Sequence, residues 1–192
     1  MMNKTITLIR HGKTAGNFEK KYIGVTDEQM TLAGEEEIRD RIYPEADIVF
    51  ASPLKRCVRT AEIIYPKIDI HVIDELRETD FGHFEGKNYI ELSDDKEYMQ
   101  WIESGGEAPF PGGESMAEAT SRVMLGFEKL IKLSKEYNNI SAVVHGGTIM
   151  SILSTLFEGE YYSYHVENGE GYTFDLSSNG LYSGLFTRSF LR

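Results

Sequence analysis

Apolar, β-branched residues gather in short runs along the chain, and most of these runs stop abruptly at polar or turn-forming residues. Runs of this length and composition predict strands, and a continuous apolar run indicates a strand buried on both faces. The predicted strands cover residues 5–9, 47–51, 68–73, 140–144, 171–176 and 181–187. The last two flank Ser178-Asn179-Gly180, a turn sequence that predicts a hairpin.

Between the strands, apolar residues recur at helical spacing behind residues that favour helix starts. The expected N-caps are Thr31, Ser52 and Ser115. Glu118 completes a capping box with the last of them. Two further helices are predicted at about residues 89–103 and 148–157, whereas residues 12–30 lack periodicity and predict a loop.

The order of elements is strand–helix–strand–helix–strand, then a long excursion, then helix–strand–helix–strand–strand. This alternation predicts an α/β fold, here a three-layer α/β/α sandwich with a mostly parallel central sheet. The excursion, at about residues 83–113, predicts a lid or insertion over a site. We expect residues 1–192 to form a single domain, since no linker or repeat interrupts them.

Composition and charge narrow the class of partner. The 192 residues carry a formal net charge of −11, which argues against nucleic acid or an anionic membrane as a partner, since both bind basic surfaces. The single cysteine, Cys57, excludes an intrachain disulfide, and no cysteine–histidine set has zinc-site spacing, so we expect no metal or cofactor. No targeting segment or membrane-spanning stretch is evident, and we expect a cytoplasmic protein.

Unusual polar residues follow the predicted strands. Arg10 and His11 end the first strand, Arg56 lies in the first helical turn after the second, Glu78 follows the third, and His145 ends the fourth. In open α/β sheets ligands bind beyond the carboxyl ends of the strands, so these side chains are expected to meet at one edge. Gly12 is expected to let the backbone turn sharply after His11.

This set of side chains suits phosphoryl transfer. The reaction needs cations around the phosphate oxygens, an in-line nucleophile and an acid for the leaving oxygen. Two arginines and a histidine can neutralise a phosphate dianion, and a neutral imidazole can attack phosphorus to form a covalent intermediate. Glu78 would protonate the leaving alkoxide and later deprotonate water.

Six segments spread over nearly the whole chain form a specific pattern when taken in order. They are Leu8-Ile-Arg-His-Gly-Lys-Thr14 with Asn17, Gly24-Val-Thr-Asp27, Ser52-Pro-Leu-Lys-Arg56, Leu76-Arg-Glu78 with Phe81-Gly82, Pro111-Gly-Gly-Glu-Ser115 and Val144-His-Gly-Gly147. The pattern resembles that of the histidine phosphatase superfamily, also called the phosphoglycerate mutase-like proteins.

The resemblance implies a role for each matching residue. His11 would be the phosphorylated nucleophile and Glu78 the proton donor and acceptor. The implied phosphate pocket consists of Arg10, Arg56, His145, Asn17 and the Gly146 backbone, with Gly24 in a loop implied to approach the substrate. Lys13 and Cys57 depart mildly from the family pattern, and neither takes part in the implied chemistry.

Three functions stay open at this point: a phosphatase, a cofactor-dependent phosphoglycerate mutase, and a non-catalytic domain that binds a phospholigand. Mutases of the family carry a longer, basic insertion, whereas the segment after Glu78 is compact and acidic, which favours a phosphatase for a small phosphorylated metabolite. Residues 75–86 and the overall size are most similar to α-ribazole phosphatases. Broad-specificity phosphatases share this pattern, so α-ribazole 5′-phosphate is one candidate substrate.

The remaining histidines and aromatic residues are interpreted as structural. Among His71, His83 and His165, the one expected nearest the pocket mouth is His83. The aromatic side chains interpreted as core or lid packing are Trp101, Phe110, Tyr161, Tyr162 and Tyr164.

Overall fold

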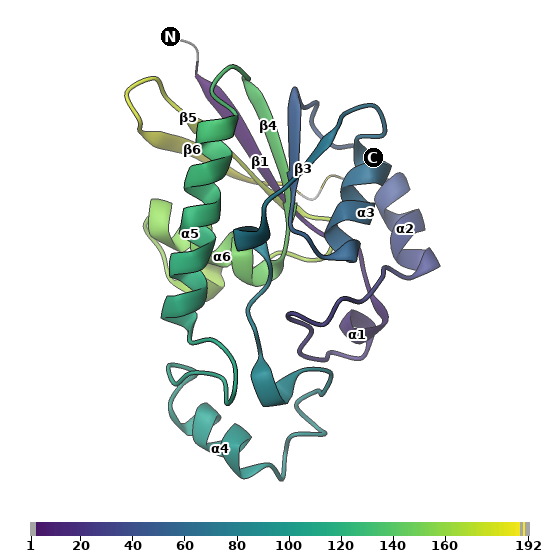
Figure 1. Ribbon diagram of the computed structural model, residues 1–192, viewed down its shortest axis with the longest axis vertical. Helices are drawn as coiled ribbons and strands as arrows, with labels where there is room; N and C mark the ends of the chain where they lie inside the picture. The colour runs from purple at the N-terminus through teal and green to yellow at the C-terminus, as the bar shows by residue number, and fades with distance from the viewer. Residues whose placement is uncertain (1–2, 189, 191–192) are drawn as a thin grey trace.

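A six-stranded sheet forms the centre of the protein in the computed structural model, which describes residues 3–188 and 190 (Figure 1). The strands are β1 (Lys4–Arg10), β2 (Ile48–Ala51), β3 (Ile70–Val72), β4 (Asn139–Val144), β5 (Gly171–Leu176) and β6 (Tyr182–Arg188). Their order is β3-β2-β4-β1-β5-β6. The first four strands of that order are parallel, and β5 pairs antiparallel with both β1 and β6. The predicted mostly parallel sheet is confirmed.

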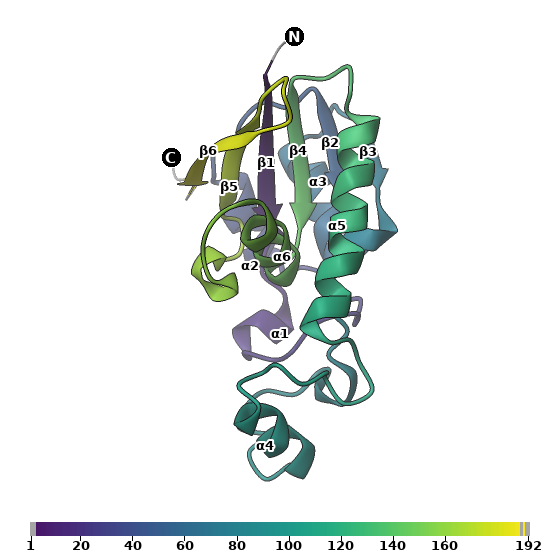
Figure 2. The ribbon, with the colours of Figure 1, turned by 90° about the vertical axis from the view of Figure 1, so that its left-hand side faces the viewer.

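Helices cover both faces of the sheet and complete the three layers (Figure 2). They are α1 (Ala15–Phe18), α2 (Leu32–Arg39), α3 (Lys55–Ile64), α4 (Lys96–Glu103), α5 (Met116–Leu133) and α6 (Gly146–Leu156), with 3-10 helices at Asp74–Leu76, Gly82–Phe84 and Tyr161–Tyr164. On one face, α5 and α6 bury Phe127 and Ile152 against Leu8 and other strand residues. On the other face, α3 buries Cys57 and Ala61. Successive side chains of each strand therefore enter two different cores.

The segment between β3 and α5 extends beyond the carboxyl ends of the strands, with α4 at the far end of the molecule from the N-terminus (Figure 1). It has a small core of its own, in which Phe84, Leu92 and Tyr98 are buried. The helix predicted at about 89–103 is shorter than expected. It begins only at Lys96, because the carboxylate of Asp95 accepts from the backbone N–H groups of the first turn and turns occupy the residues before it.

Two of the three predicted N-caps are confirmed. The Thr31 hydroxyl accepts from the Gly34 N–H, and Ser115 forms the predicted capping box with Glu118. The prediction for Ser52 is wrong, since α3 begins at Lys55 with Leu54 at the N-cap and without a side-chain cap. The Ser52 hydroxyl has a different partner, described with the site below.

Two smaller expectations also change. The loop predicted at 12–30 contains the short helix α1, which Thr14 caps, and β3 is shorter than the predicted strand at 68–73. Within residues 3–188 and 190, no helix is long and apolar enough to cross a membrane. The cytoplasmic location stays a prediction.

Candidate active site

His11 lies where β1 ends, at the carboxyl edge of the sheet, and only 4% of it is exposed. Its Nδ1 lies 2.8 Å from the carbonyl oxygen of Gly12. A carbonyl can only accept a hydrogen bond, so Nδ1 carries the proton of the neutral ring. The lone pair of that ring is therefore on Nε2, which makes Nε2 the nitrogen that could attack an electrophile.

Gly12 supports this arrangement by close packing. Its φ is not positive, so the expectation that glycine relieves a sharp turn is wrong. A Cβ at this position would instead lie 2.8 Å from Ile38 and overlap the sulfur of Met30. Its N–H donates to the Thr60 hydroxyl at 3.0 Å, which fixes the backbone directly after His11.

Two arginine side chains converge on this region, and backbone carbonyls hold the outer nitrogens of each. Arg10 donates through Nη1 to the Val166 carbonyl at 2.6 Å. Arg56, which is fully buried, donates through Nη1 to the Thr26 carbonyl and through Nη2 to the Gly24 carbonyl, both at 2.7 Å. The Nε atoms of both arginines are buried without a hydrogen-bond partner within the described chain. Buried donors without partners are uncommon, and the oxygens of a bound anion could accept from them.

His145 lies beside His11 because β1 and β4 pair in parallel, with Arg10 opposite Val144. The two imidazole rings meet edge to face with their centroids 5.2 Å apart. His145 is fully buried, and its Nε2 lies 2.6 Å from the Ser52 hydroxyl, the group predicted to cap α3. The Cys57 sulfur also lies 3.4 Å from this nitrogen. The serine therefore orients an imidazole instead of a helix end.

Burial and charge keep both histidines neutral. Burial lowers the pKa of His11 well below its usual 6.5, and the nearby guanidinium groups of Arg56 and Arg10 lower it further, against a smaller opposing effect of the Gly12 carbonyl. Burial lowers the pKa of His145 as well, with Arg56 and His11 adding to the effect. A neutral ring at the end of β1 is the form that can attack phosphorus.

Glu78 reaches the same place from the segment after β3. One carboxylate oxygen accepts from the Thr79 N–H at 2.9 Å, and the other accepts from the Gly147 N–H in the first turn of α6 at 3.1 Å. Arg122 holds the preceding backbone, since its guanidinium donates to the carbonyls of residues 75, 77 and 78 and to the Glu114 carboxylate. The Glu78 carboxylate is thus held directly by two N–H groups, and its backbone is held by Arg122.

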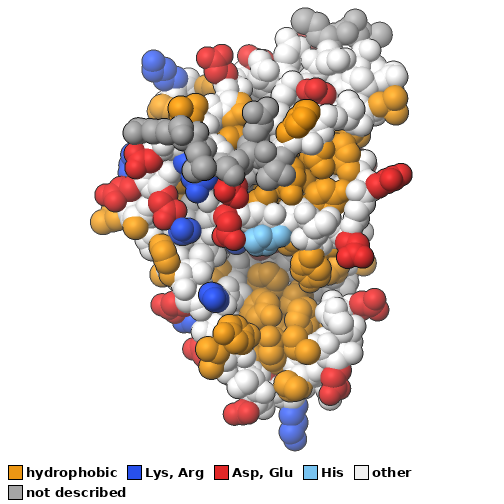
Figure 3. Space-filling view, turned by 180° about the vertical axis from the view of Figure 1, so that it is seen from behind, with side chains coloured by type: hydrophobic (Ala, Val, Ile, Leu, Met, Phe, Trp, Pro, Cys, Tyr) orange, Lys and Arg blue, Asp and Glu red, His pale blue; other side chains and the backbone are white. Residues whose placement is uncertain are grey.

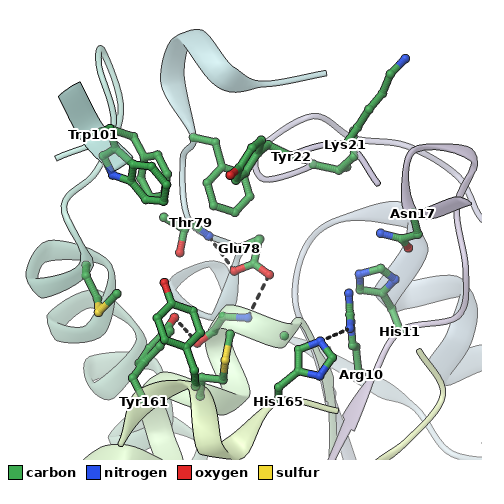
Figure 4. Close-up of a pocket in the computed structure, with 18 residues that line it drawn as sticks. Arg10, His11, Asn17, Lys21, Tyr22, Glu78, Thr79, Trp101, Tyr161 and His165 are labelled. Atoms are coloured by element: carbon green, nitrogen blue, oxygen red, sulfur yellow. Dashed lines mark hydrogen bonds between the residues drawn. The ribbon is translucent and has the colours of Figure 1, made fainter. Parts of the chain in front are cut away.

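These groups surround a cavity of about 330 Å³ (Figure 4). Its inner end is polar and includes Arg10, His11, Asn17, Glu78 and Gly146. Its outer part is lined by aromatic and apolar side chains, namely Ile23, Tyr22, Phe81, Trp101, Phe110, Met116, Met150, Tyr161 and Tyr162. In Figure 3, hydrophobic side chains gather in a hollow on the lower half of the face shown.

The structure brings five of the predicted site residues together in the cavity lining, namely Arg10, His11, Asn17, Glu78 and Gly146. Arg56 and His145, also predicted for the phosphate pocket, are fully buried and do not line the cavity, although the His145 ring contacts that of His11. Gly24 does not line the cavity: Ile23 does, and the Gly24 carbonyl binds Arg56. His83 binds Glu97, whereas His165, interpreted as structural, lines the cavity 3.5 Å from Arg10 Nη1.

Sequence reasoning also missed Asn168, which is nearly buried. Its Nδ2 donates to the His11 carbonyl at 2.9 Å and to Asn17 Oδ1 at 3.1 Å. The same oxygen of Asn17 accepts from the Thr14 N–H, so the Asn17 amide nitrogen is left for the cavity. No periodicity or spacing marks an asparagine in a loop so far along the chain.

Comparison with known proteins agrees with this geometry. Residues 6–183 match the family model described as "Histidine phosphatase superfamily (branch 1)". The chain belongs to the histidine phosphatase superfamily. This confirms the resemblance seen in the motifs and the prediction of an enzyme of the histidine phosphatase type.

Relatives within the superfamily carry different names. The chain is 34% identical over 163 residues to an uncharacterized phosphatase, PhoE, of Bacillus subtilis, covering 81% of this chain and 78% of that protein. It is 30% identical to a 2,3-bisphosphoglycerate-dependent phosphoglycerate mutase of Cytophaga hutchinsonii, covering 79% and 76%. A putative alpha-ribazole-5′-P phosphatase of Escherichia coli has the same fold, with a TM-score of 0.84, 23% identity and coverage of 98% and 96%.

Within the part of the chain that the structure describes, no three His, Cys, Asp or Glu side chains are grouped so that they could hold a metal ion. The polar groups at the inner end are the imidazoles, guanidiniums and carboxylate described above.

Proposed function

We propose that the protein hydrolyses phosphomonoesters of small metabolites through a phosphohistidine on His11. The observation that carries this proposal is the pair of buried, unpartnered Nε groups of Arg10 and Arg56 beside a neutral imidazole. Carbonyls already occupy Nη1 of Arg10 and both outer nitrogens of Arg56, whereas neither Nε group has an acceptor among the described residues. A phosphate group provides such oxygens and the matching charge.

In the first half-reaction, the lone pair of His11 Nε2 forms a bond to phosphorus while the bond from phosphorus to the leaving oxygen breaks. Glu78 gives its proton to that oxygen and becomes a carboxylate. In the second half-reaction, this carboxylate takes a proton from water as the water oxygen attacks phosphorus. The P–N bond breaks, which returns His11 and Glu78 to their starting forms and releases inorganic phosphate.

The outer part of the cavity supports hydrolysis of an ester with an uncharged, flat alcohol. Lys21 is the one lysine among its lining residues, and its ammonium group is paired with Glu19 at 2.6 Å and points away from the cavity in Figure 4. A mutase acting on phosphoglycerate must hold a substrate carboxylate, for which this aromatic wall provides no free lysine. Aromatic rings instead favour stacking with an aromatic group. α-Ribazole 5′-phosphate is therefore a candidate substrate.

Hydrolysis of p-nitrophenyl phosphate by the wild type and by His11→Ala tests the catalytic part of this proposal. We expect turnover by the wild type alone, with label from a ³²P-substrate trapped on His11 as an acid-labile, alkali-stable phosphoenzyme. Label on another residue, or none during turnover, would contradict the mechanism. Inactivity of the wild type on every phosphomonoester would favour a binding domain.

A panel of metabolite phosphates that includes α-ribazole 5′-phosphate tests the substrate class. The relative from Cytophaga hutchinsonii makes mutase activity the second candidate. A dependence on 2,3-bisphosphoglycerate and the conversion of 3-phosphoglycerate into 2-phosphoglycerate would identify a mutase.

A further inference from the structure

Glu85 lies outside the cavity lining, yet its carboxylate is the most heavily bonded side chain near the site. Oε1 accepts from the backbone N–H groups of Gly24 at 3.0 Å and Val25 at 3.1 Å. Oε2 accepts from the Thr26 N–H at 3.3 Å and from the Thr26 hydroxyl. One half-buried carboxylate therefore gathers the inward-pointing donors of residues 24–26.

The opposite side of this same loop holds Arg56. Its guanidinium donates to the carbonyls of Gly24 and Thr26 at 2.7 Å and to that of Ile23 at 3.4 Å. N–H groups and carbonyls of one short loop thus point in opposite directions, with Glu85 on one side and Arg56 on the other. Residues 24–26 therefore link the Glu85 carboxylate, outside the cavity, to the Arg56 guanidinium on the other side of the loop.

The loop is packed too tightly to find another position easily. A Cβ at Gly24 would overlap the Thr79 carbonyl and would lie 2.9 Å from the Phe81 ring. Glu85 Oε1 also accepts from the Phe81 N–H at 3.2 Å, so the carboxylate fixes the segment that follows Glu78 as well. Asp27 ties the far end of the loop to α3, since its carboxylate accepts from the Lys55 N–H at 2.7 Å.

We infer that Glu85 is a positioning residue for the reaction: its carboxylate sets the conformation of residues 24–26, and their carbonyls aim the Arg56 guanidinium at the transferring phosphoryl group. This inference rests on the proposed function. The Gly24-Val-Thr-Asp27 motif then has a role different from the one predicted from the sequence, which was to approach the substrate. The loop acts on the phosphate through an arginine, and it does so without lining the cavity.

Glu85→Gln is the most informative change, because it preserves size and removes the second acceptor oxygen. An amide NH₂ facing the N–H groups of the loop would be donor against donor, so the loop must shift. Misplacement of a group in the site by about 1 Å can lower turnover on the order of 100-fold. We expect kcat/KM for p-nitrophenyl phosphate to fall about 10- to 100-fold and the Ki of inorganic phosphate to rise.

Glu91→Gln is the matched control. Glu91 lies in the same segment and accepts from one local N–H, that of Asn88 at 2.8 Å, so its variant should behave as the wild type does. The Arg56→Ala background supplies the second control. If Glu85 acts through Arg56, Glu85→Gln should cost little more once Arg56 is absent, and the double-mutant cycle should be strongly non-additive.

Wild-type kinetics for Glu85→Gln would overturn the inference, and so would full additivity with Arg56→Ala. If Glu85→Gln does not fold, Thr26→Val replaces it, since this exposed change removes only the hydroxyl that donates to Glu85. The valine variant should show a smaller loss with the same non-additivity, and additive or absent effects would again contradict the inference. An inactive wild type would instead sink the proposed function, so the two failures are distinguishable.

Discussion

The two ends of the cavity are built on different principles. At the inner end, strand termini and the first turns of helices bring polar atoms together, and almost every one of them has a fixed partner: His11 with Gly12, His145 with Ser52, Glu78 with Gly147. At the outer end, Trp101 and Phe110 stack on each other with ring centroids 4.9 Å apart in a small separate core. The proposed function therefore assigns chemistry and substrate selectivity to separate parts of the fold, so that each could change without the other.

Among changes outside the nucleophile, the largest loss shared by all substrates is expected from Arg10→Ala. Removing one preorganised donor to a developing charge lowers turnover about 100- to 1,000-fold. Because the phosphoryl group is the same in every substrate, the loss in kcat/KM should be similar for p-nitrophenyl phosphate and for an alkyl phosphate. Arg59→Ala, which affects an exposed arginine paired with Glu35, is the control and should leave both rates unchanged. A loss confined to one substrate would contradict the division between the two ends.

Glu78→Gln should come next and should depend on the leaving group. General acid catalysis contributes about 100- to 10,000-fold where the leaving oxygen needs a proton. An alkyl phosphate should therefore lose at least about 100-fold in kcat, whereas p-nitrophenolate leaves without help and should lose less in the first half-reaction. Equal losses for the two substrates in single-turnover experiments would argue against Glu78 as the acid.

Acidic pH should destabilise the protein because of the two buried histidines near the inner end of the cavity. The pKa of His11 and of His145 is lowered in the folded protein, so below pH 6.5 the unfolded chain binds protons that the folded chain does not. The contribution of the two histidines to the free energy of unfolding should be complete above pH 6.5. Below that pH the free energy of unfolding should fall by about 1.4 kcal/mol per pH unit for each histidine until the pH reaches the lowered pKa.

Urea unfolding between pH 6.5 and 5.5 measures this slope in a range above the usual pKa of carboxylic acids. His11→Ala should reduce the slope by about half, whereas His71→Asn, at an exposed position, should not change it. A flat profile in the wild type would show that the two rings are not held neutral.

The smallest effect is expected at the outer end, from Trp101→Ala. A well-placed aromatic contact is worth about 0.5–1.5 kcal/mol, so KM for an aryl phosphate should rise about 2- to 10-fold with kcat little changed. A small alkyl phosphate should show no such rise. Tyr89→Ala, at an exposed aromatic position of the same segment, is the control. A large fall in kcat would mean that the outer end takes part in the chemistry.

Much of the inner end could be predicted because local patterns determine it. Apolar runs that stop at Arg10-His11 and at His145 predict strand ends, and parallel neighbouring strands bring such ends together. The family pattern then selected Glu78 among several nearby carboxylates. The capping box at Ser115 and the hairpin near the C-terminus follow from equally local rules.

What could not be predicted depends on contacts between distant parts of the chain. Ser52 has the composition of a helix cap, yet its hydroxyl binds an imidazole 93 positions away. Asn168 and Arg122 hold the backbone of His11 and Glu78 through side-chain hydrogen bonds that leave no periodic pattern in the sequence. Glu85 reaches its loop across some sixty positions. The roles of such residues can be recognised only from the tertiary structure.

The unpaired Nε groups of Arg10 and Arg56 also couple the stability of the protein to its surroundings. A buried donor without an acceptor costs roughly 1–3 kcal/mol, so an anion that accepts from these two groups would stabilise the folded protein. Inorganic phosphate has the same oxygens as the group that is transferred. Inorganic phosphate, the product of the proposed reaction, should therefore stabilise the folded protein. As it accumulates it should also inhibit the reaction by occupying the site of the transferred group.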